Sequence, residues 1–211
     1  MGEFDDEIAP YPIEEKKPNL SSHEVVAIKS MRDTDEGPRA DTSLDALAKL
    51  KSVFAADGTV TAGNSSQMSD GAGAVVVMSA AALKRFNLEP IGRFVGYAVA
   101  GVPPEIMGIG PIKAIPKVLK QTGLKQEELD WIELNEAFAS QALAVIREVG
   151  LDPARVNING GAIALGHPLG CTGAKLTIQV LNDMKRLNKK YGMVTACVGG
   201  GQGIAGVIEN L

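Results

Sequence analysis

The sequence has 211 residues, of which 45% are hydrophobic, 22% are charged and 24 are glycine, a composition typical of a globular α/β protein. Its net charge of −4 and the lack of a basic block argue against a nucleic-acid-binding protein. No apolar run approaches the ~18 residues that would span a bilayer, so we expect no membrane-spanning segment.

The ends of the sequence and its cysteines favour a cytoplasmic protein. The acidic start at residues 1–7 lacks the basic and apolar regions of a signal peptide, and the last three residues are not a peroxisomal signal. The two cysteines, Cys171 and Cys197, lie in apolar or glycine-rich settings that suit reduced thiols.

The first 89 residues contain few regular elements. In chain order they predict a solvated charged turn at 14–18, a strand at 23–28, a helix capped by Ser43, a polar loop at 58–73, a strand at 74–78 and a helix capped by Ser79. The run at 74–78 is continuously apolar, which favours a strand buried on both faces.

From residue 90 the strand and helix patterns alternate regularly, which predicts a layered sheet flanked by helices. The expected elements are a strand at 93–99, a helix at 108–123, a strand at 131–134, a helix to about 149, a helix after 173, and strands at 193–198 and 204–208. The glycine turn between the last two strands predicts an antiparallel pair. One apolar stripe of the last helix contains Leu176, Val180, Met184 and Leu187.

Three loops carry residues with catalytic chemistry. Asn135 follows a strand, His167 lies between glycines at the mouth of a helix, and Cys197 precedes a glycine-rich turn. Ligands of open α/β sheets bind at the carboxyl ends of strands, so we expect the three side chains to meet at one edge. An imidazole and a thiol can exchange protons with a carbon acid or a thiolate leaving group, and backbone N–H groups of the glycines could stabilise an enolate.

Simpler explanations remain open for several of these residues. His167 could fill a turn, the second histidine, His23, suits a surface position, and Cys171 suits a small packing residue. The Gly-Ile-Gly at 108–110 fits the start of a helix as well as a nucleotide-binding loop. No Cys-x-x-Cys or His-x-x-x-His spacing is present, so we expect no metal site.

Four segments together resemble the signature motifs of thiolases. They are 61–72 (Thr-Ala-Gly-Asn-Ser-Ser-Gln-Met-Ser-Asp-Gly-Ala), 135–139 (Asn-Glu-Ala-Phe-Ala), 161–170 (Gly-Ala-Ile-Ala-Leu-Gly-His-Pro-Leu-Gly) and 197–203 (Cys-Val-Gly-Gly-Gly-Gln-Gly). They occur in the family's order and at matching separations. The first resembles the coenzyme A loop, and its Asn-Ser-Ser-Gln is closer to 3-ketoacyl-CoA thiolases than to acetoacetyl-specific ones.

The resemblance implies a thiolase-type layered α/β fold, in which helices flank a mixed five-stranded sheet. By the family's architecture, residues 1–68 correspond to the remainder of the loop domain that binds coenzyme A. Residues 69–89 correspond to the last strand and helix of a missing N-terminal domain, and residues 90–211 to the whole C-terminal domain. The strand at 74–78 would therefore lack its sheet in this chain.

The resemblance also assigns roles to individual residues. The histidine matching His167 activates a nucleophilic cysteine and contributes to an oxyanion hole, and the asparagine matching Asn135 holds the water that completes it. Cys197 matches the second acid/base, and the N–H at Gly199 lines a second oxyanion hole. Contacts to coenzyme A, which is a substrate rather than a bound cofactor, are implied for Ser66, Ala62, Gly63, Met107, Phe138 and Arg39.

The chain departs from the family pattern in one respect. Thiolases are much longer, and their nucleophilic cysteine lies in an N-terminal half, in a motif that neither Cys171 nor Cys197 matches. We therefore expect this chain to be the C-terminal portion of a 3-ketoacyl-CoA thiolase (acetyl-CoA C-acyltransferase) of fatty acid β-oxidation. Alone it should be inactive, because a base without its nucleophile cannot form the acyl-enzyme.

Several alternatives stay open at this point. The chain could be a truncated product or one subunit of a split thiolase, which would need a complementary N-terminal half and would form a homo-oligomer when complete. It could instead be a non-catalytic thiolase-like protein that binds coenzyme A esters or serves as a partner subunit. A condensing enzyme of the ketoacyl synthase type is less consistent, because those enzymes place histidine where this chain has Cys197.

Overall fold

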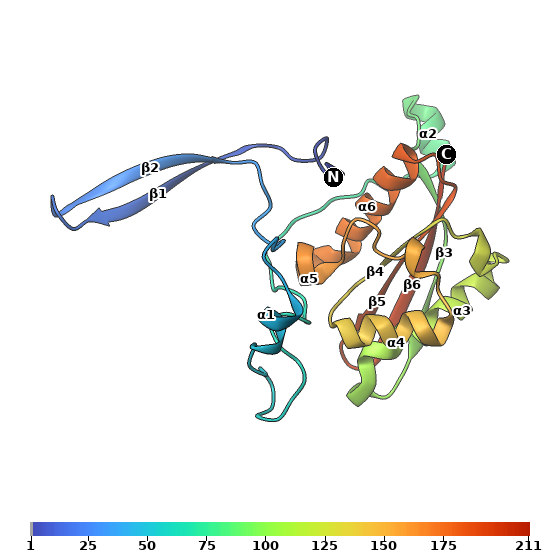
Figure 1. The fold of residues 1–211 in the computed structure, drawn as a ribbon. Helices are drawn as coiled ribbons and strands as arrows, with labels where there is room; N and C mark the ends of the chain where they lie inside the picture. The colour runs from blue at the N-terminus through green and yellow to red at the C-terminus, as the bar shows by residue number, and fades with distance from the viewer. Residues whose placement is uncertain (1) are drawn as a thin grey trace. The chain divides into compact units, whose positions relative to one another are not determined.

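The computed structural model describes residues 2–211, and the chain divides into two units, Met1–Ala40 and Asp41–Leu211. The first unit contains a hairpin, and the second contains a sheet with helices around it (Figure 1). Of the helices in the described part of the chain, none is both long enough and apolar enough to cross a bilayer.

The unit Met1–Ala40 is built around an antiparallel hairpin of β1 (Tyr11–Asn19) and β2 (Glu24–Arg32). β2 contains most of the strand predicted at 23–28, and His23 in the turn before it is exposed, as expected. Every residue of β2 is exposed, so cross-strand pairing rather than apolar burial holds this hairpin together.

The charged residues 14–18 do not form the predicted turn but lie within β1. Pairing across the hairpin explains the difference, because Glu14 faces Lys29 and their side chains form an ion pair at 3.8 Å. The turn follows Asn19 instead, whose Oδ1 accepts hydrogen bonds from the backbone N–H groups two and three residues later.

The first two helices of the unit Asp41–Leu211 begin where serine caps were predicted. α1 (Leu44–Ala48) follows Ser43, and α2 (Ala80–Phe86) follows Ser79. In each case the serine Oγ accepts a hydrogen bond from the backbone N–H three residues later, which satisfies one of the unpaired donors at the helix start.

The apolar run 74–78 is not the buried strand that its sequence predicted. It has no regular secondary structure, and Val76 and Val77 are 80% and 84% exposed. A strand is stable only when a neighbouring strand completes its backbone hydrogen bonds, and no strand of residues 2–211 pairs with this run.

The central sheet has four strands in the order β3-β6-β5-β4 (Figure 1). They are β3 (Gly92–Gly101), β4 (Trp131–Leu134), β5 (Tyr191–Val198) and β6 (Gln202–Asn210). β4 and β5 are parallel, whereas β6 is antiparallel to both β5 and β3, so the sheet is mixed and its last two strands pair as predicted. The five-stranded sheet implied by the resemblance is not found among residues 2–211; beside β4, apart from β5, there is only an isolated parallel bridge between Val156 and Ile132.

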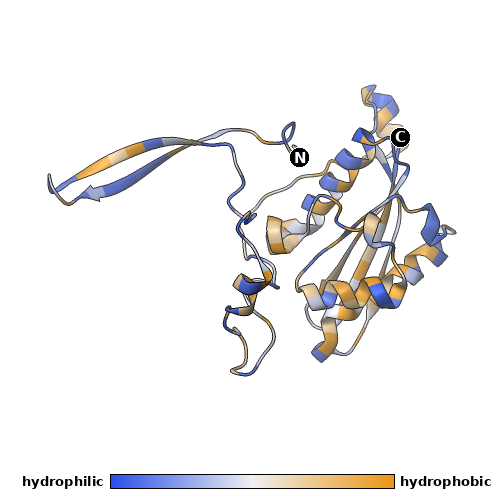
Figure 2. Cartoon of the chain, viewed as in Figure 1, coloured by the Kyte–Doolittle hydropathy of each residue, from blue (hydrophilic) through white to orange (hydrophobic). Residues whose placement is uncertain are grey.

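Helices cover both faces of this sheet. α3 (Gly110–Thr122) and α4 (Ala139–Val149) pack on one face, and α6 (Thr172–Arg186) packs on the other (Figure 1). Shorter helical segments are η1 (Pro104–Ile109), η2 (Gln126–Glu128), η3 (Pro153–Arg155), α5 (Ala162–Leu165) and η4 (Leu169–Cys171). Hydrophobic residues predominate on the central strands, as Figure 2 shows, and the layered arrangement confirms the predicted fold class.

The apolar residues of β4 alternate between the two cores. Ile132 and Leu134 face α3 and α4, whereas Trp131 packs against α6. On α6, three of the four residues of the predicted stripe are buried: Leu176, Val180 and Met184. Leu187 is 42% exposed, because the helix ends at Arg186 and Leu187 forms its C-cap.

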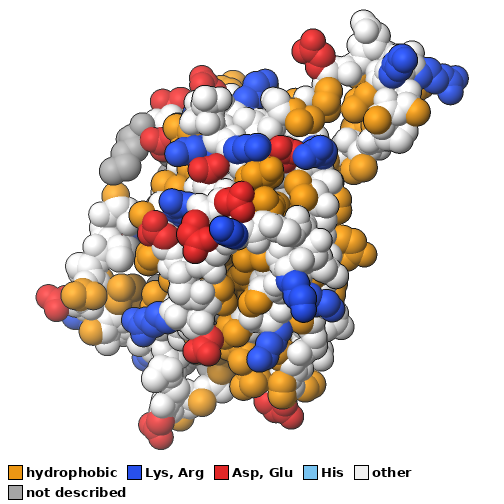
Figure 3. Space-filling view, turned by 90° about the vertical axis from the view of Figure 1, so that its right-hand side faces the viewer, with side chains coloured by type: hydrophobic (Ala, Val, Ile, Leu, Met, Phe, Trp, Pro, Cys, Tyr) orange, Lys and Arg blue, Asp and Glu red, His pale blue; other side chains and the backbone are white. Residues whose placement is uncertain are grey.

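The start of α3 packs directly on β6. A Cβ atom on either Gly110 or Gly203 would overlap the backbone of the other residue's segment. Close packing of a helix start therefore explains the glycines at 108–110 without a nucleotide. β3 pairs with β6 on the side away from β5 and is an edge strand, on which Phe94 and Tyr97 are exposed. Figure 3 shows hydrophobic side chains interspersed with charged ones on one face of the molecule.

Candidate active site

Asn135 lies directly after β4, at the carboxyl end of the strand, and is 2% exposed. Its N–H donates to the carbonyl of Thr195 in β5 at 2.9 Å, which extends the parallel pairing beyond the strand. The side chain of Asn157 both donates to the carbonyl of Leu134 and accepts from its N–H, at 2.8 and 2.9 Å. These bonds fix the backbone that carries Asn135.

His167 is held by the polar loop that the sequence singled out at 61–72. The N–H of His167 donates to the carbonyl of Gln67 at 2.9 Å, and Met68 forms a parallel bridge with His167. The amide of the Gln67 side chain also donates to the carbonyls of Ile163 and Ala164, at 3.1 and 2.9 Å. The two motif loops therefore lie side by side although they are far apart in the sequence.

The side chains of Asn135 and His167 meet, as the sequence predicted. The distance from Asn135 Nδ2 to His167 Nε2 is 3.4 Å, and His167 Nδ1 lies 2.6 Å from the Oγ1 of Thr172. The Oδ1 of Asn135 is buried and has no hydrogen-bond partner among the described residues. Burial, together with the positive charge of Lys175, lowers the pKa of His167, so the ring is neutral near pH 7.

Cys197 lies near the carboxyl end of β5, two residues after Thr195, which pairs with Leu134. Because Asn135 follows Leu134, the parallel register brings Cys197 and Asn135 to the same edge of the sheet. Burial raises the pKa of the Cys197 thiol. Within residues 2–211, no hydrogen bond links this thiol to His167 or Asn135, so the three residues share an edge but a hydrogen-bonding contact joins only two of the side chains.

The glycine-rich turn after Cys197 joins β5 to β6. Gly200 and Gly201 have φ angles of +84° and +93°, which favour glycine. The carbonyl of Gly201 accepts a hydrogen bond from Val102 N–H at 2.8 Å. Gly199 is exposed, and a Cβ atom there would meet nothing within 4 Å, so its surroundings leave room for a ligand beside its backbone.

Four of the residues expected to contact coenzyme A lie in one neighbourhood. Ser66 N–H donates to the carbonyl of Ala137 at 2.9 Å, next to Phe138, and Ser65 forms a bridge with Phe138 itself. Ala62 and Gly63 belong to the same loop, and a Cβ atom on Gly63 would overlap leucine side chains around α1. The loop is thus fastened to the segment that follows Asn135.

The other two expected contacts belong to other segments of the chain. Met107 is half-buried in η1, a segment that packs against α4 through Gly108 and Gln141. Arg39 is exposed and belongs to the unit Met1–Ala40.

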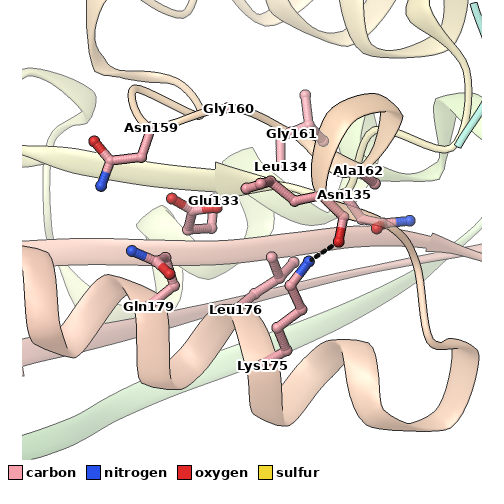
Figure 4. Close-up of a pocket in the computed structure, with 11 residues that line it drawn as sticks. Glu133, Leu134, Asn135, Asn159, Gly160, Gly161, Ala162, Lys175, Leu176 and Gln179 are labelled. Carbon is pink, nitrogen blue, oxygen red and sulfur yellow. Dashed lines mark hydrogen bonds between the residues drawn. The ribbon is translucent and has the colours of Figure 1, made fainter. Parts of the chain in front are cut away.

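A small cavity of about 20 Å³ lies behind Asn135, between β4, the 159–162 segment and α6 (Figure 4). Lys175 projects from α6 and donates to the carbonyls of Leu165 and Gly166, at 3.2 and 3.0 Å. Glu133 lines the opposite wall and accepts from the indole N–H of Trp131 at 2.7 Å. Burial raises the pKa of Glu133 to about 7, with a further increase from Asp183.

Comparison with protein families gives this arrangement its context. The model of the thiolase C-terminal domain matches residues 88–210, and that of the thiolase N-terminal domain matches residues 1–81. The chain belongs to the thiolase family. All four motifs that resemble thiolase signatures lie within the matched residues.

Individual thiolases match almost the whole chain. It is 52% identical over 208 residues to the 3-ketoacyl-CoA thiolase of Bacillus subtilis and 51% identical over 204 residues to an acetyl-CoA acetyltransferase of Pseudomonas aeruginosa, covering 99% and 97% of this chain. A crystal structure of human mitochondrial 3-ketoacyl-CoA thiolase in complex with CoA matches with a TM-score of 0.86 and 47% identity. The match to this structure covers 100% of the present chain but only 50% of the human chain. The matches to the two bacterial relatives cover 53% and 50% of those proteins. The chain thus spans about half the length of these thiolases.

Three residues that hold the thiolase motifs together were missed in the sequence. Gln67 lies in the loop that the sequence singled out, but its packing against the His167 loop is a long-range contact. Thr172 and Lys175 are five and eight residues after His167, at the start of α6. A hydroxyl residue five positions after the candidate histidine was the available signal for Thr172.

Proposed function

We propose that this chain provides the acid/base half of the active site of a 3-ketoacyl-CoA thiolase, an acetyl-CoA C-acyltransferase. The reaction is thiolytic cleavage of a 3-ketoacyl-CoA by coenzyme A, which yields acetyl-CoA and a shortened acyl-CoA in fatty acid β-oxidation. The observation that carries the proposal is the 3.4 Å contact between Asn135 and His167, at the sheet edge that also holds Cys197.

In this proposal His167 is the base for a nucleophilic cysteine that a complementary N-terminal half supplies. A neutral imidazole is needed for that role, and the lowered pKa of His167 keeps it neutral near pH 7. The resulting thiolate adds to the 3-keto carbon, and the bond between C2 and C3 then breaks. The acyl group remains on the cysteine as a thioester, and the electron pair leaves on the enolate of acetyl-CoA.

Cys197 would return a proton to C2 of that enolate. Its raised pKa suits this step, because a thiol that remains protonated is ready to act as an acid. Asn135 would hold a water against the substrate oxygen, with its unpaired buried Oδ1 as an acceptor, and Gly199 N–H would stabilise developing oxyanion charge. Coenzyme A would then take up the acyl group: its thiol proton would pass to the Cys197 thiolate, and the protonated His167 would return its proton to the departing nucleophilic cysteine.

The loop at 61–72 is the proposed binding surface for the pantetheine arm of coenzyme A. Ser66 and Phe138, which adjacent backbone pairings hold together, would contact this arm. The remaining proposed contacts are Ala62, Gly63, Met107 and, near the adenine, Arg39. Coenzyme A is a substrate here, and the reaction as proposed uses no resident cofactor.

The proposal includes that the 211-residue chain is inactive by itself. It has two cysteines, and neither Cys171 nor Cys197 lies in the motif of a thiolase nucleophile. The test is to mix the chain with a separately produced N-terminal half of the Bacillus subtilis relative and to follow thiolysis of acetoacetyl-CoA and of a longer 3-ketoacyl-CoA. We expect turnover only in the mixture, and faster turnover of the longer substrate.

Cys197→Ala should abolish any turnover that the mixture recovers, whereas Cys171→Ala should leave it nearly unchanged. Turnover by the chain alone would refute the inactivity. A mixture that forms a stable complex and binds coenzyme A but never cleaves substrate would favour the alternative of a non-catalytic coenzyme A ester-binding or partner subunit.

Two further properties are proposed with the function. Assembly with a complementary half into a homo-oligomer is testable by light scattering of the mixture. A cytoplasmic location is testable by fractionation of cells that express the chain, since the family includes a mitochondrial member in human cells.

A further inference from the structure

We propose that Thr172 is a positioning residue that holds His167 in the tautomer with its proton on Nδ1, so that Nε2 can accept a proton. The catalytic meaning of this inference rests on the proposed function. The tautomer itself is a property of the chain and can be measured without any activity.

The backbone between the two residues explains how they meet. Leu169 N–H donates to the carbonyl of His167 at 2.8 Å, and Cys171 N–H donates to the carbonyl of Pro168 at 2.7 Å. Leu169 has a φ of +25°, which is uncommon for a residue with a side chain. This tight reversal brings the first residue of α6 back beneath the ring, where Thr172 Oγ1 lies 2.6 Å from Nδ1.

The partners of the two ring nitrogens define the tautomer. A neutral imidazole has one nitrogen that donates and one that accepts. Asn135 Nδ2, which can only donate, lies 3.4 Å from Nε2, so Nε2 is the acceptor. The proton therefore lies on Nδ1 and is donated to the hydroxyl oxygen of Thr172, which can accept it.

Thr172 is suited to such a role because it is fixed in place. It is 5% exposed, and no other hydrogen bond of its hydroxyl is seen among the described residues. The ring that it faces is kept neutral by burial and by Lys175, one turn further along α6, which lower the pKa of His167. A neutral ring is the state in which the choice of tautomer matters.

The intrinsic preference of histidine makes this contact necessary. A neutral imidazole in water prefers the proton on Nε2, which would leave the catalytic nitrogen unable to accept one. A hydrogen-bond acceptor at Nδ1 reverses that preference by stabilising the other tautomer. Thr172 is the side chain that supplies the acceptor.

The test is nitrogen NMR of the full chain with isotope-labelled histidine at about pH 8, where an unperturbed histidine is neutral. The chain has two histidines, and the exposed His23 serves as an internal reference for the preference in water. We expect His167 to show a protonated Nδ1 and an unprotonated Nε2, opposite to His23. A protonated Nε2 in the unsubstituted chain would overturn the proposal.

Two substitutions separate positioning from packing. Thr172→Val keeps the shape but removes the acceptor and should move His167 toward the Nε2-protonated form, whereas Thr172→Ser should retain the native tautomer. An unchanged tautomer in Thr172→Val, with the methyl spectrum of the core preserved, would contradict the proposal. If Thr172→Val fails to fold, the unsubstituted chain and Thr172→Ser still decide the result.

The complemented enzyme provides a second, separable test. Thr172→Val should lower kcat for thiolysis by about tenfold or more while KM changes little, with rescue by Thr172→Ser. If no thiolysis is ever recovered but His167 carries its proton on Nδ1, the proposed function fails and the tautomer assignment stands. If thiolysis is recovered but His167 carries its proton on Nε2, the tautomer assignment fails and the proposed function stands.

Discussion

Two short segments that were both predicted to be strands differ in burial and in secondary structure. The four residues of β4, Trp131–Leu134, are all buried, whereas the run 74–78 is exposed and irregular. Composition does not explain the difference, because Ala-Val-Val-Val-Met has a stronger strand propensity than Trp-Ile-Glu-Leu, which contains a carboxylate. β4 has a parallel neighbour in β5 and a helix layer over each face. Pairing and cover, rather than propensity, decide which run becomes a strand.

The largest predicted change in stability is for glycine substitutions around the β5–β6 turn. A Cβ atom on Gly203 would overlap the backbone of Gly110, whereas one on Gly199 would meet nothing within 4 Å. Gly203→Ala should therefore destabilise the chain by about 3 kcal/mol or more. The matched Gly199→Ala should change stability by less than about 0.5 kcal/mol. Urea unfolding measures both, and equal effects would show that the α3–β6 contact is not tight.

A somewhat smaller change in stability, dependent on pH, is expected from the carboxyl group of Glu133 on β4. Burial raises the pKa of Glu133 from 4.5 to about 7, so folding favours the protonated form. The stability that the neutral carboxyl retains below pH 4.5 is lost as pH rises to about 7, and the loss is then complete.

Glu133→Gln can still accept the hydrogen bond from Trp131 but cannot ionise. Relative to the unsubstituted chain, it should gain up to about 3 kcal/mol of stability at about pH 8 and little at about pH 4. Unfolding curves across this range measure the difference. A gain that is constant with pH would mean that Glu133 is not neutral in the folded state. Glu15→Gln, in the exposed hairpin, should show no gain at high pH.

The smallest of the three predicted stability changes is for valine-to-alanine substitution, compared between the buried sheet and the exposed run 74–78. Val207 in β6 is fully buried, and Val77 is 84% exposed. Val207→Ala should cost about 2 kcal/mol through lost burial and the cavity left behind. Val77→Ala should cost less than about 0.5 kcal/mol. A comparable loss at Val77 in the isolated chain would mean that the run 74–78 is packed in solution.

Elements whose sequence pattern matches their final surroundings were predicted well. The helices α3, α4 and α6 and the four strands of the sheet lie close to their expected positions, because each apolar stripe or run meets a covering layer. The charged segment at 14–18 was mistaken for a turn because its ion pair with β2 is a contact across the hairpin. The end of α6 before Leu187 depends on one C-cap and could not be fixed by periodicity.

The candidate site shows the same division. Sequence patterns identified the motif residues Asn135, His167 and Cys197, because polar residues and glycines that follow a predicted strand can be recognised from residue order alone. Gln67 and Thr172 were not, because their importance lies in which atom they face. A hydrogen bond depends on distances of a few tenths of an ångström, which residue spacing does not encode.

By itself, the sequence determined the alternation of strands and helices, the family and the residue types available for acid/base chemistry. Only the tertiary structure decided that Asn135 reaches Nε2 of His167 and that Thr172 faces Nδ1. The physical reason is that propensity and hydrophobic periodicity are local. Hydrogen-bond partners and burial are supplied by segments distant in the chain, and they exist only once those segments have packed.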